Sequence, residues 1–175
     1  MAFGHHPANL NLSILSILAV SPLITFLSMA ADSPFFGEEE QQRIVAAIQE
    51  AERQTSGEIK VHIEKKCTAE NVMDRAKEVF GLLNMHQTQD HNGVLFYLAY
   101  EDRKFAIFGD QGIFEKVSET FWNSTKDLLR SNFANKRFAD GLCLGIKEAG
   151  IQLKKHFPYS SDDVNELPDD ISFGS

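Results

Sequence analysis

The chain has 175 residues, of which 43% are hydrophobic, and a formal net charge of -8, so its length suits one folded domain with terminal extensions. Nine of the 25 acidic residues lie before Arg43 or after Lys155, in two stretches without Lys or Arg, which leaves 16 acids against 17 bases between them. No basic run with interleaved aromatic residues occurs, which excludes nucleic acid as the expected partner.

Residues 10–30 are predominantly apolar and uncharged, a length just sufficient to cross a bilayer. Residues 28–30, Ser-Met-Ala, also fit a signal-peptide cleavage site. The lack of Lys or Arg before the segment argues against a signal peptide, and Pro22 with five Ser or Thr residues argues against a stable span. We therefore expect a membrane-anchored or exported protein if residues 1–30 are translated, and a cytoplasmic protein if translation starts at Met29.

The first folded elements are a helix and a strand. Residues 38–54 have an apolar stripe at helical spacing and three Glu in the first turn, and Gly57 is a stop signal. Residues 58–64 alternate between apolar and polar side chains. This alternation predicts a strand with one solvated face, on which His62 is a surface residue.

A second helix and a hairpin follow. Thr68 or Asn71 can cap the helix, which runs to about Leu83. Residues 94–100 are apolar without a break, as in a strand that is buried on both faces. After a polar turn, residues 104–108 form a second short strand, so the two strands predict a tight antiparallel hairpin at the centre of a sheet.

The helical periodicity returns after the hairpin, with a break near Asn123, and the last helix covers residues 138–157 before Pro158 ends it. The acidic remainder has too little apolar content to fold alone. The predicted organisation is an apolar N-terminal segment at 1–32, one domain at 33–158 and an acidic tail at 159–175.

These elements predict an α/β fold, namely a small mixed sheet with a central antiparallel hairpin, flanked by helices in the order α-β-α-β-β-α-α. A strand, a crossover helix and a returning strand form a right-handed parallel unit. The starts of strands 58–64 and 94–100 and the end of strand 104–108 should therefore meet at one end of the sheet. We call this end the rim, and its polar residues are Glu58, Asp90, His91, Asn92 and Asp110.

The rim is a candidate metal site with Glu58, Asp90, Asn92 and Asp110 as ligands. Carboxylate and amide oxygens are what a hard cation such as Ca²⁺ prefers, although the spacing is not that of an EF-hand loop. The alternative is structural: Asp110 caps the following helix, Asp90 and Asn92 build a turn, and Glu58 is solvated. For Asp110 the two interpretations are compatible.

Phosphate chemistry has weaker signals. Residues 109–112, Gly-Asp-Gln-Gly, pass from a strand into a helix, where exposed N–H groups can hold an anion, but the adjacent carboxylates repel phosphate unless a metal lies between them. Familiar phosphatase, Walker A and nucleophile-elbow motifs are missing, so hydrolysis would need a metal-polarised phosphate and an activated water. Cys67 and Cys143 fit no metal-ligand spacing and indicate two buried free thiols, with a disulfide as the alternative.

Four segments resemble the TPM-domain family, which is known from a thylakoid-lumen protein of photosystem II repair and from membrane-associated bacterial and animal members. They are TSGEIKVHIE at 55–64, NGVLFYLA at 92–99, DRKFAIFGDQG at 102–112 and FADGLCLGIKEAG at 138–150. The chain is most similar to a compact bacterial subgroup that closes with NELPD, here residues 165–169. The resemblance implies a small sheet flanked by helices, calcium binding and, for the plant members, an acid-phosphatase-type activity.

Two functions are therefore expected. The first is a divalent-cation-binding interaction module, in which the rim or the NELPD tail engages a protein partner in assembly or repair. The alternative is a metal-dependent acid-phosphatase-type hydrolase that acts at the Glu58, Asp90 and Asp110 rim. The module is favoured because a cation site has visible ligands, whereas no nucleophile or general acid stands out, and whether the protein is an enzyme stays open.

Overall fold

The structure is a computed structural model that describes residues 35–174. The segment 1–32 lies outside the described residues, and the predictions about membrane insertion, export and the start site lie there with it. Within residues 35–174 no helix combines the length and the apolar character that a membrane span requires.

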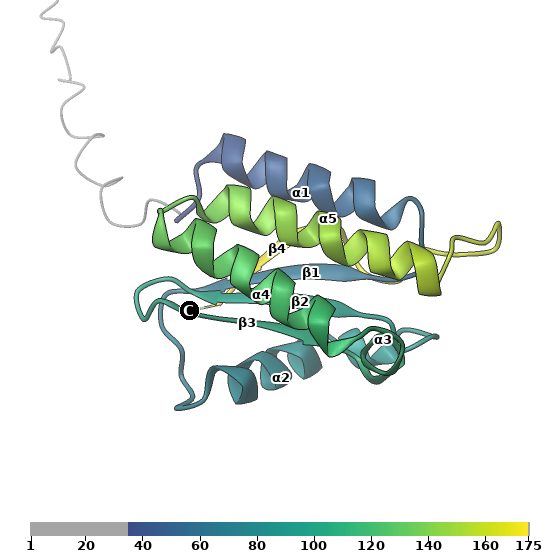
Figure 1. The fold of residues 1–175 in the computed structure, drawn as a ribbon, viewed down its shortest axis with the longest axis horizontal. Coiled ribbons are helices and arrows are strands. Elements are labelled where there is room, and N and C mark those ends of the chain that lie inside the picture. Colours follow the sequence, from purple (N-terminus) through teal and green to yellow (C-terminus); the bar gives the residue numbers. More distant parts are fainter. Residues whose placement is uncertain (1–34, 175) are drawn as a thin grey trace, which may run out of the picture. The chain divides into compact units, whose positions relative to one another are not determined.

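The described chain consists of one sheet with helices on both faces (Figure 1). The helices α1, α4 and α5 cover one face, and α2 covers the other (Figure 1). In chain order the elements are α1 Glu38–Glu52, β1 Ile59–Glu64, α2 Val72–Leu82, the 3₁₀ turn η1 Met85–Gln87, β2 Val94–Ala99, β3 Lys104–Gly109, α3 Gln111–Lys116, α4 Glu119–Ala134, α5 Phe138–His156 and β4 Ile171–Phe173.

The sheet is mixed, with the strand order β3-β2-β1-β4. β1 pairs with β2 in parallel, with Ile59 opposite Val94, and β2 pairs with β3 in antiparallel, with Val94 opposite Gly109. The predicted α/β class, the parallel crossover and the antiparallel hairpin are thus confirmed. β2 is an interior strand, whereas β3 forms one edge of the sheet.

The other edge comes from the acidic tail. β4 pairs with β1 in parallel, with Val61 opposite Ile171, and the Gly174 amide donates a hydrogen bond to the Ile63 carbonyl at 2.9 Å. Three residues are too few to fold alone, but they are enough to extend an existing strand. The sheet therefore extends beyond the predicted domain boundary at Pro158.

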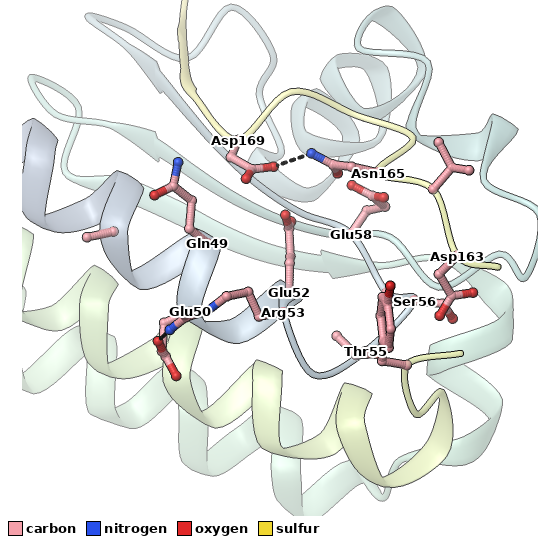
Figure 2. Close-up of a pocket in the computed structure, with 14 residues that line it drawn as sticks. Gln49, Glu50, Glu52, Arg53, Thr55, Ser56, Glu58, Asp163, Asn165 and Asp169 are labelled. Carbon is pink, nitrogen blue, oxygen red and sulfur yellow. Dashed lines mark hydrogen bonds and ion pairs between the residues drawn. The ribbon is translucent and has the colours of Figure 1, made fainter. Parts of the chain in front are cut away.

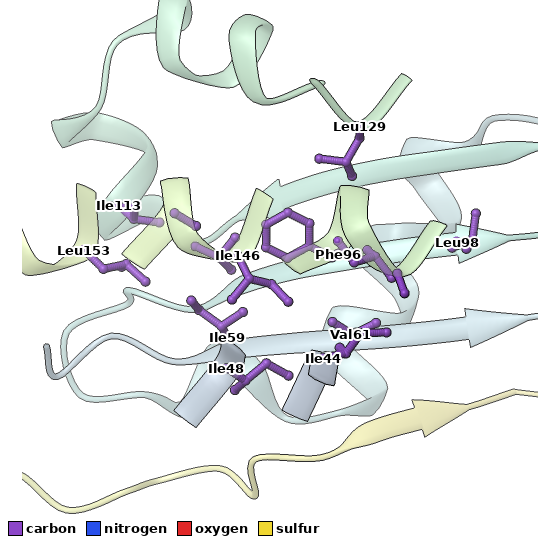
Figure 3. Packing of buried hydrophobic residues seen from close by; sticks show 14 of the residues in the cluster. Ile44, Ile48, Ile59, Val61, Phe96, Leu98, Ile113, Leu129, Ile146 and Leu153 are labelled. Carbon is purple, nitrogen blue, oxygen red and sulfur yellow. The ribbon is translucent and has the colours of Figure 1, made fainter. Parts of the chain in front are cut away.

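The main core lies between the sheet and the layer of α1, α4 and α5. Figure 3 shows Ile44 and Ile48 of α1 beside Ile59 and Val61 of β1, and Ile146 of α5 beside Phe96 of β2. α5 approaches closely because residue 145 is glycine: a Cβ there would lie 2.6 Å from Leu129 and 2.9 Å from Phe96. The small residue thus lets α5 pack against both α4 and the centre of the sheet.

A second core lies under α2. Ala76, Val79 and Phe80 pack there with Met85 against the opposite side of β2. Leu95 and Phe96 are both 0% exposed although they point to opposite faces, so the prediction that this strand is buried on both faces is confirmed.

The helical region after the hairpin is divided earlier than expected. α3 ends at Lys116, and α4 begins after Ser118, whose Oγ accepts a hydrogen bond from the Phe121 amide. The break predicted near Asn123 is therefore wrong. An N-cap serine restarts the helix five residues before that point.

The prediction of a solvated face on β1 is also wrong. Lys60, His62 and Glu64 are 3%, 7% and 1% exposed. His62 lies 2.7 Å from Ser172 Oγ and 3.2 Å from Glu64, and Glu64 accepts hydrogen bonds from Arg75 and from the Tyr97 hydroxyl. The polar face is buried because α2, β2 and the tail supply a partner for each of these groups.

Cys67 and Cys143 are free and half-buried. The free-thiol interpretation is thus confirmed over the disulfide, whereas full burial of the two side chains is not observed.

Candidate functional site

The predicted rim is present at one end of the sheet. The Val94 amide donates to the Glu58 carbonyl at 2.8 Å, and the Asp110 amide donates to the Gly93 carbonyl at 2.9 Å. These two bonds place the starts of β1 and β2 beside the end of β3. The backbone therefore brings Glu58, Asn92 and Asp110 to the same end, as the topology predicts.

Asp110 has a structural role there. Its Oδ1 accepts a hydrogen bond from the Gln111 amide at 2.8 Å and caps α3, while its Oδ2 lies 3.2 Å from His91 Nδ1. The capping interpretation of Asp110 is confirmed. The adjoining Gly112 is explained by packing, since a Cβ there would lie 2.3 Å from the Asp90 carbonyl oxygen.

Ser56 connects two other rim residues. Its hydroxyl lies 3.3 Å from the Asp90 carboxylate, and it accepts a hydrogen bond from the Asn92 amide group at 3.2 Å. Asp90 is exposed, whereas Asn92 is 1% exposed. The Asn92 Oδ1 is buried and has no hydrogen-bond partner among the residues that the structure describes.

Glu58 is buried rather than solvated, with 4% exposure, so this part of the structural alternative is wrong. Its Oε1 accepts a hydrogen bond from the Glu166 amide at 2.8 Å. Its Oε2 is buried and finds no partner within residues 35–174. The acidic tail therefore covers Glu58 and directs backbone amides to its carboxylate.

A pocket of about 670 Å³ opens beside Glu58, between the end of α1, the start of β1 and the tail. We call it the acidic pocket, because its lining includes the carboxylates Glu50, Glu52, Glu58, Asp163 and Asp169. In Figure 2, Glu52 points from the end of α1 towards Asp169 and Glu58. Its Oε1 accepts a hydrogen bond from the Ile59 amide at 2.6 Å, and its Oε2 is buried without a partner in the described part of the chain.

Burial shifts the pKa of both glutamates upward. It raises the pKa of Glu52 to about 9, against the hydrogen bond from the Ile59 amide, and the nearby carboxylates of Asp169 and Glu58 raise it further. Burial also raises the pKa of Glu58 to about 7, although the backbone amides of Glu166 and Leu167 lower it. The two side chains therefore hold protons more tightly than ordinary carboxylates do.

The rim carboxylates are divided between separate contacts. Glu58 faces the acidic pocket, Asp90 lies against Ser56, and Asp110 lies against His91. Within residues 35–174, no three His, Cys, Asp or Glu side chains are grouped as a metal-binding set. Metal ligation by Glu58, Asp90, Asn92 and Asp110 thus stays a prediction.

Glu52 was not predicted as part of the site, and residues 165–169, NELPD, were predicted as a partner-binding alternative to the rim but not as a neighbour of Glu58. One signal for Glu52 is present in the sequence, because it is the last residue of α1, where the helix dipole disfavours an acid. The tail gives no such signal, since its contact with Glu58 joins residues 108 positions apart.

Comparison with known proteins relates this chain to a family. The family model of the TPM domain matches residues 31–151. The BA42 protein of the psychrophilic bacterium Bizionia argentinensis is similar in structure with a TM-score of 0.76 and 46% identity, covering 83% of this chain and 100% of that chain. No curated protein matches.

The N-terminal domain of the cg2496 protein of Corynebacterium glutamicum shares the fold. Its TM-score is 0.56 at 13% identity, over 78% of this chain and 93% of that chain.

Proposed function

The chain belongs to the TPM-domain family, and we propose that it is a divalent-cation-binding module that engages a protein partner in assembly or repair. The cation would bind in the acidic pocket, with Glu58 of the rim as its central ligand. The role in assembly or repair is carried over from the resemblance to the family, whereas the cation site is argued from the residues of this chain.

The observation that carries the proposal is the orphaned carboxylate oxygen of Glu58. A buried polar atom without a partner is costly, and buried polar atoms are normally hydrogen-bonded. Here the Oε2 of Glu58 and the Oε2 of Glu52 both lack a partner among the described residues, and both side chains line one pocket. A cation would satisfy both oxygens at once.

The donor set fits a hard cation. Glu52, Glu58 and Asp169 offer carboxylate oxygens, and Asn165, whose Nδ2 donates to Asp169 Oδ1 at 2.8 Å, offers an amide oxygen. Ca²⁺ takes such oxygens with flexible geometry, whereas Mg²⁺ demands a tighter arrangement and gives up its waters reluctantly. Because no set of three is gathered closely in the described chain, binding would draw these side chains together.

The tail connects cation binding to the position of the NELPD segment. The Glu166 amide bonds to Glu58, while the Glu166 carboxylate accepts from the Gln89 amide at 3.2 Å. A cation held between Glu58 and Asp169 would therefore fix the NELPD segment between α1 and the rim. A partner that recognises this segment would bind the loaded form more tightly.

Calcium titration of the full chain by calorimetry tests the site. We expect binding heat for Ca²⁺ and less for Mg²⁺, with a higher melting temperature in millimolar Ca²⁺, because a ligand that binds only the folded state stabilises it. Glu58→Gln and Glu52→Gln should each remove most of the heat. Glu39→Gln, on the exposed first turn of α1, is the matched control and should leave the heat unchanged.

The outcomes separate the two expected functions. Absence of calcium heat, or an equal loss in the Glu39→Gln control, would contradict the cation site. Turnover of p-nitrophenyl phosphate that is abolished by chelation and by Glu58→Gln would favour the hydrolase. Binding without turnover supports the module, which we favour because the pocket's carboxylates repel phosphate.

A further inference from the structure

β3 presents unpaired backbone groups at the edge of the sheet. It pairs with β2 on one side and has no strand on the other among residues 35–174. The bond from the Asp110 amide to the Gly93 carbonyl fixes the alternation, so that every second residue of β3 bonds to β2. The N–H and C=O groups of Phe105, Ile107 and Gly109 therefore point away from the sheet.

This edge is the floor of a largely apolar groove of about 1000 Å³, which we call the edge groove. One wall is α2, with Val72, Met73 and Lys77. The opposite wall is formed by α3 and α4, with Phe114, Trp122 and Lys126 as its principal lining residues. Phe114 is 63% exposed and stacks on Trp122 with 6.3 Å between the ring centroids, so the wall offers apolar surface to a ligand.

The middle of the edge groove is positively charged. Lys77 and Lys126 stand on opposite walls, both exposed, and neither forms an ion pair within the described residues. Lys126 donates to Asn123. Two acids, Asp110 and Glu119, also line the groove: Asp110 contacts His91 and caps α3, whereas Glu119 is exposed in the first turn of α4.

We propose that the edge groove binds an extended peptide segment of a partner protein, which adds to β3 as a further strand. Main-chain hydrogen bonds to Phe105, Ile107 and Gly109 would supply affinity, as in other cases of strand addition. Alternate side chains of the peptide would face the two walls. Apolar side chains fit the lining of both walls, and acidic side chains at the centre fit Lys77 and Lys126.

Charge favours a peptide over a second copy of the chain. An isologous pair of β3 edges would run antiparallel and would place each element beside its own copy. Lys77 would then face Lys77 of the other copy, and Lys126 would face Lys126. An acidic, apolar peptide avoids this repulsion and neutralises both lysines.

Fluorescence anisotropy with the full chain tests the proposal. The probe is a labelled nine-residue peptide in which valine alternates with threonine, and glutamate replaces the central valine and one neighbouring threonine, so that one glutamate faces each wall. We expect saturable binding that weakens about tenfold when lysine replaces the glutamates. A peptide of the same sequence with N-methyl groups on alternate backbone nitrogens, which removes donors without changing the protein, should not bind.

Protein variants locate the binding. The double variant Lys77→Glu with Lys126→Glu should bind the glutamate peptide (the acidic probe) more weakly and the peptide with lysine in place of glutamate more tightly. Lys147→Glu, on the exposed surface of α5, should change neither affinity. Equal binding of the methylated and unmodified peptides would overturn strand addition. If the double variant binds the acidic probe with unchanged affinity, the edge groove is not the binding site and the proposal is wrong. A peptide-free dimer that Ile107→Pro, which removes an outward N–H of β3, abolishes would also overturn the proposal and assign the edge to a second copy.

Discussion

At the scale of single residues, burial decides how the carboxylates of the acidic pocket behave. An ordinary Glu has a pKa of 4.5, but burial in the folded chain raises the pKa of Glu58 to about 7 and the pKa of Glu52 to about 9. The folded state therefore binds more protons than the unfolded state from pH 4.5 up to about pH 9. In this range, the free energy of unfolding falls as the pH rises, because each ionisation leaves a charge in a poorly solvated place.

We predict that urea denaturation will show this loss of stability between pH 4.5 and about pH 9. Glu52→Gln should reduce the slope from pH 4.5 to about 9, and Glu58→Gln should reduce it only from pH 4.5 to about 7, since the replaced side chain can no longer ionise. Glu39→Gln should keep the parent's slope. A parent whose stability rises over this range would contradict the raised pKa values.

At the scale of the secondary-structure elements, β1 shows what an alternating pattern can and cannot say. The alternation identifies the strand and its apolar face, because Ile59, Val61 and Ile63 all enter the main core. It does not distinguish a solvated polar face from a buried one whose groups have partners. Arg75 and Ser172, which provide those partners, lie on elements that pair or pack with β1 only after folding.

β4 shows a second limit. A three-residue strand lies within the range where sequence patterns carry little information, and its neighbours are acidic. β4 and the residues just before it cover the polar face of β1. The Lys60 ammonium donates to the Pro168 carbonyl and to Asp170, and the Ser172 hydroxyl is hydrogen-bonded to His62. Without β4 and the preceding residues, Lys60 and His62 would lose these hydrogen bonds and the chain segment that shields them from solvent.

We predict that truncation after Pro158 lowers the free energy of unfolding by on the order of 3 kcal/mol, at about 1 kcal/mol for each net hydrogen bond lost. The bonds at risk include those from Gly174 to Ile63, from Glu166 to Glu58 and between Ser172 and His62. Urea denaturation measures the change, with Asp162→Asn, an exposed tail substitution, as the control. An unchanged urea midpoint would instead support a domain that ends at Pro158.

At the scale of the whole molecule, the topology was predictable because its signals are local. The continuous apolar run of β2, the helical stripes and the handedness of the crossover together place the rim at one end of the sheet. The partners of the rim residues were not predictable. Glu58 turns to a tail segment 108 residues away, and Asp90 and Asp110 find Ser56 and His91 instead of each other.

The two proposed sites lie on opposite sides of the sheet's centre. The acidic pocket is built on β1 and the tail, whereas the edge groove is built on β3. Between β1 and β3 lies β2, which is buried on both faces and hydrogen-bonded to both neighbours. A packed central strand offers no second arrangement that either ligand could favour, and coupling requires such a two-state element.

We therefore predict that calcium and the peptide bind independently. The dissociation constant of the acidic probe should agree within about twofold with and without saturating Ca²⁺, since coupled sites typically differ by about fivefold or more. Lys77→Glu with Lys126→Glu should likewise leave the calcium titration unchanged. A larger shift that appears in both directions would show, by reciprocity, that the segment from Asp90 to Asp110 moves as a unit and transmits binding from the pocket to the groove.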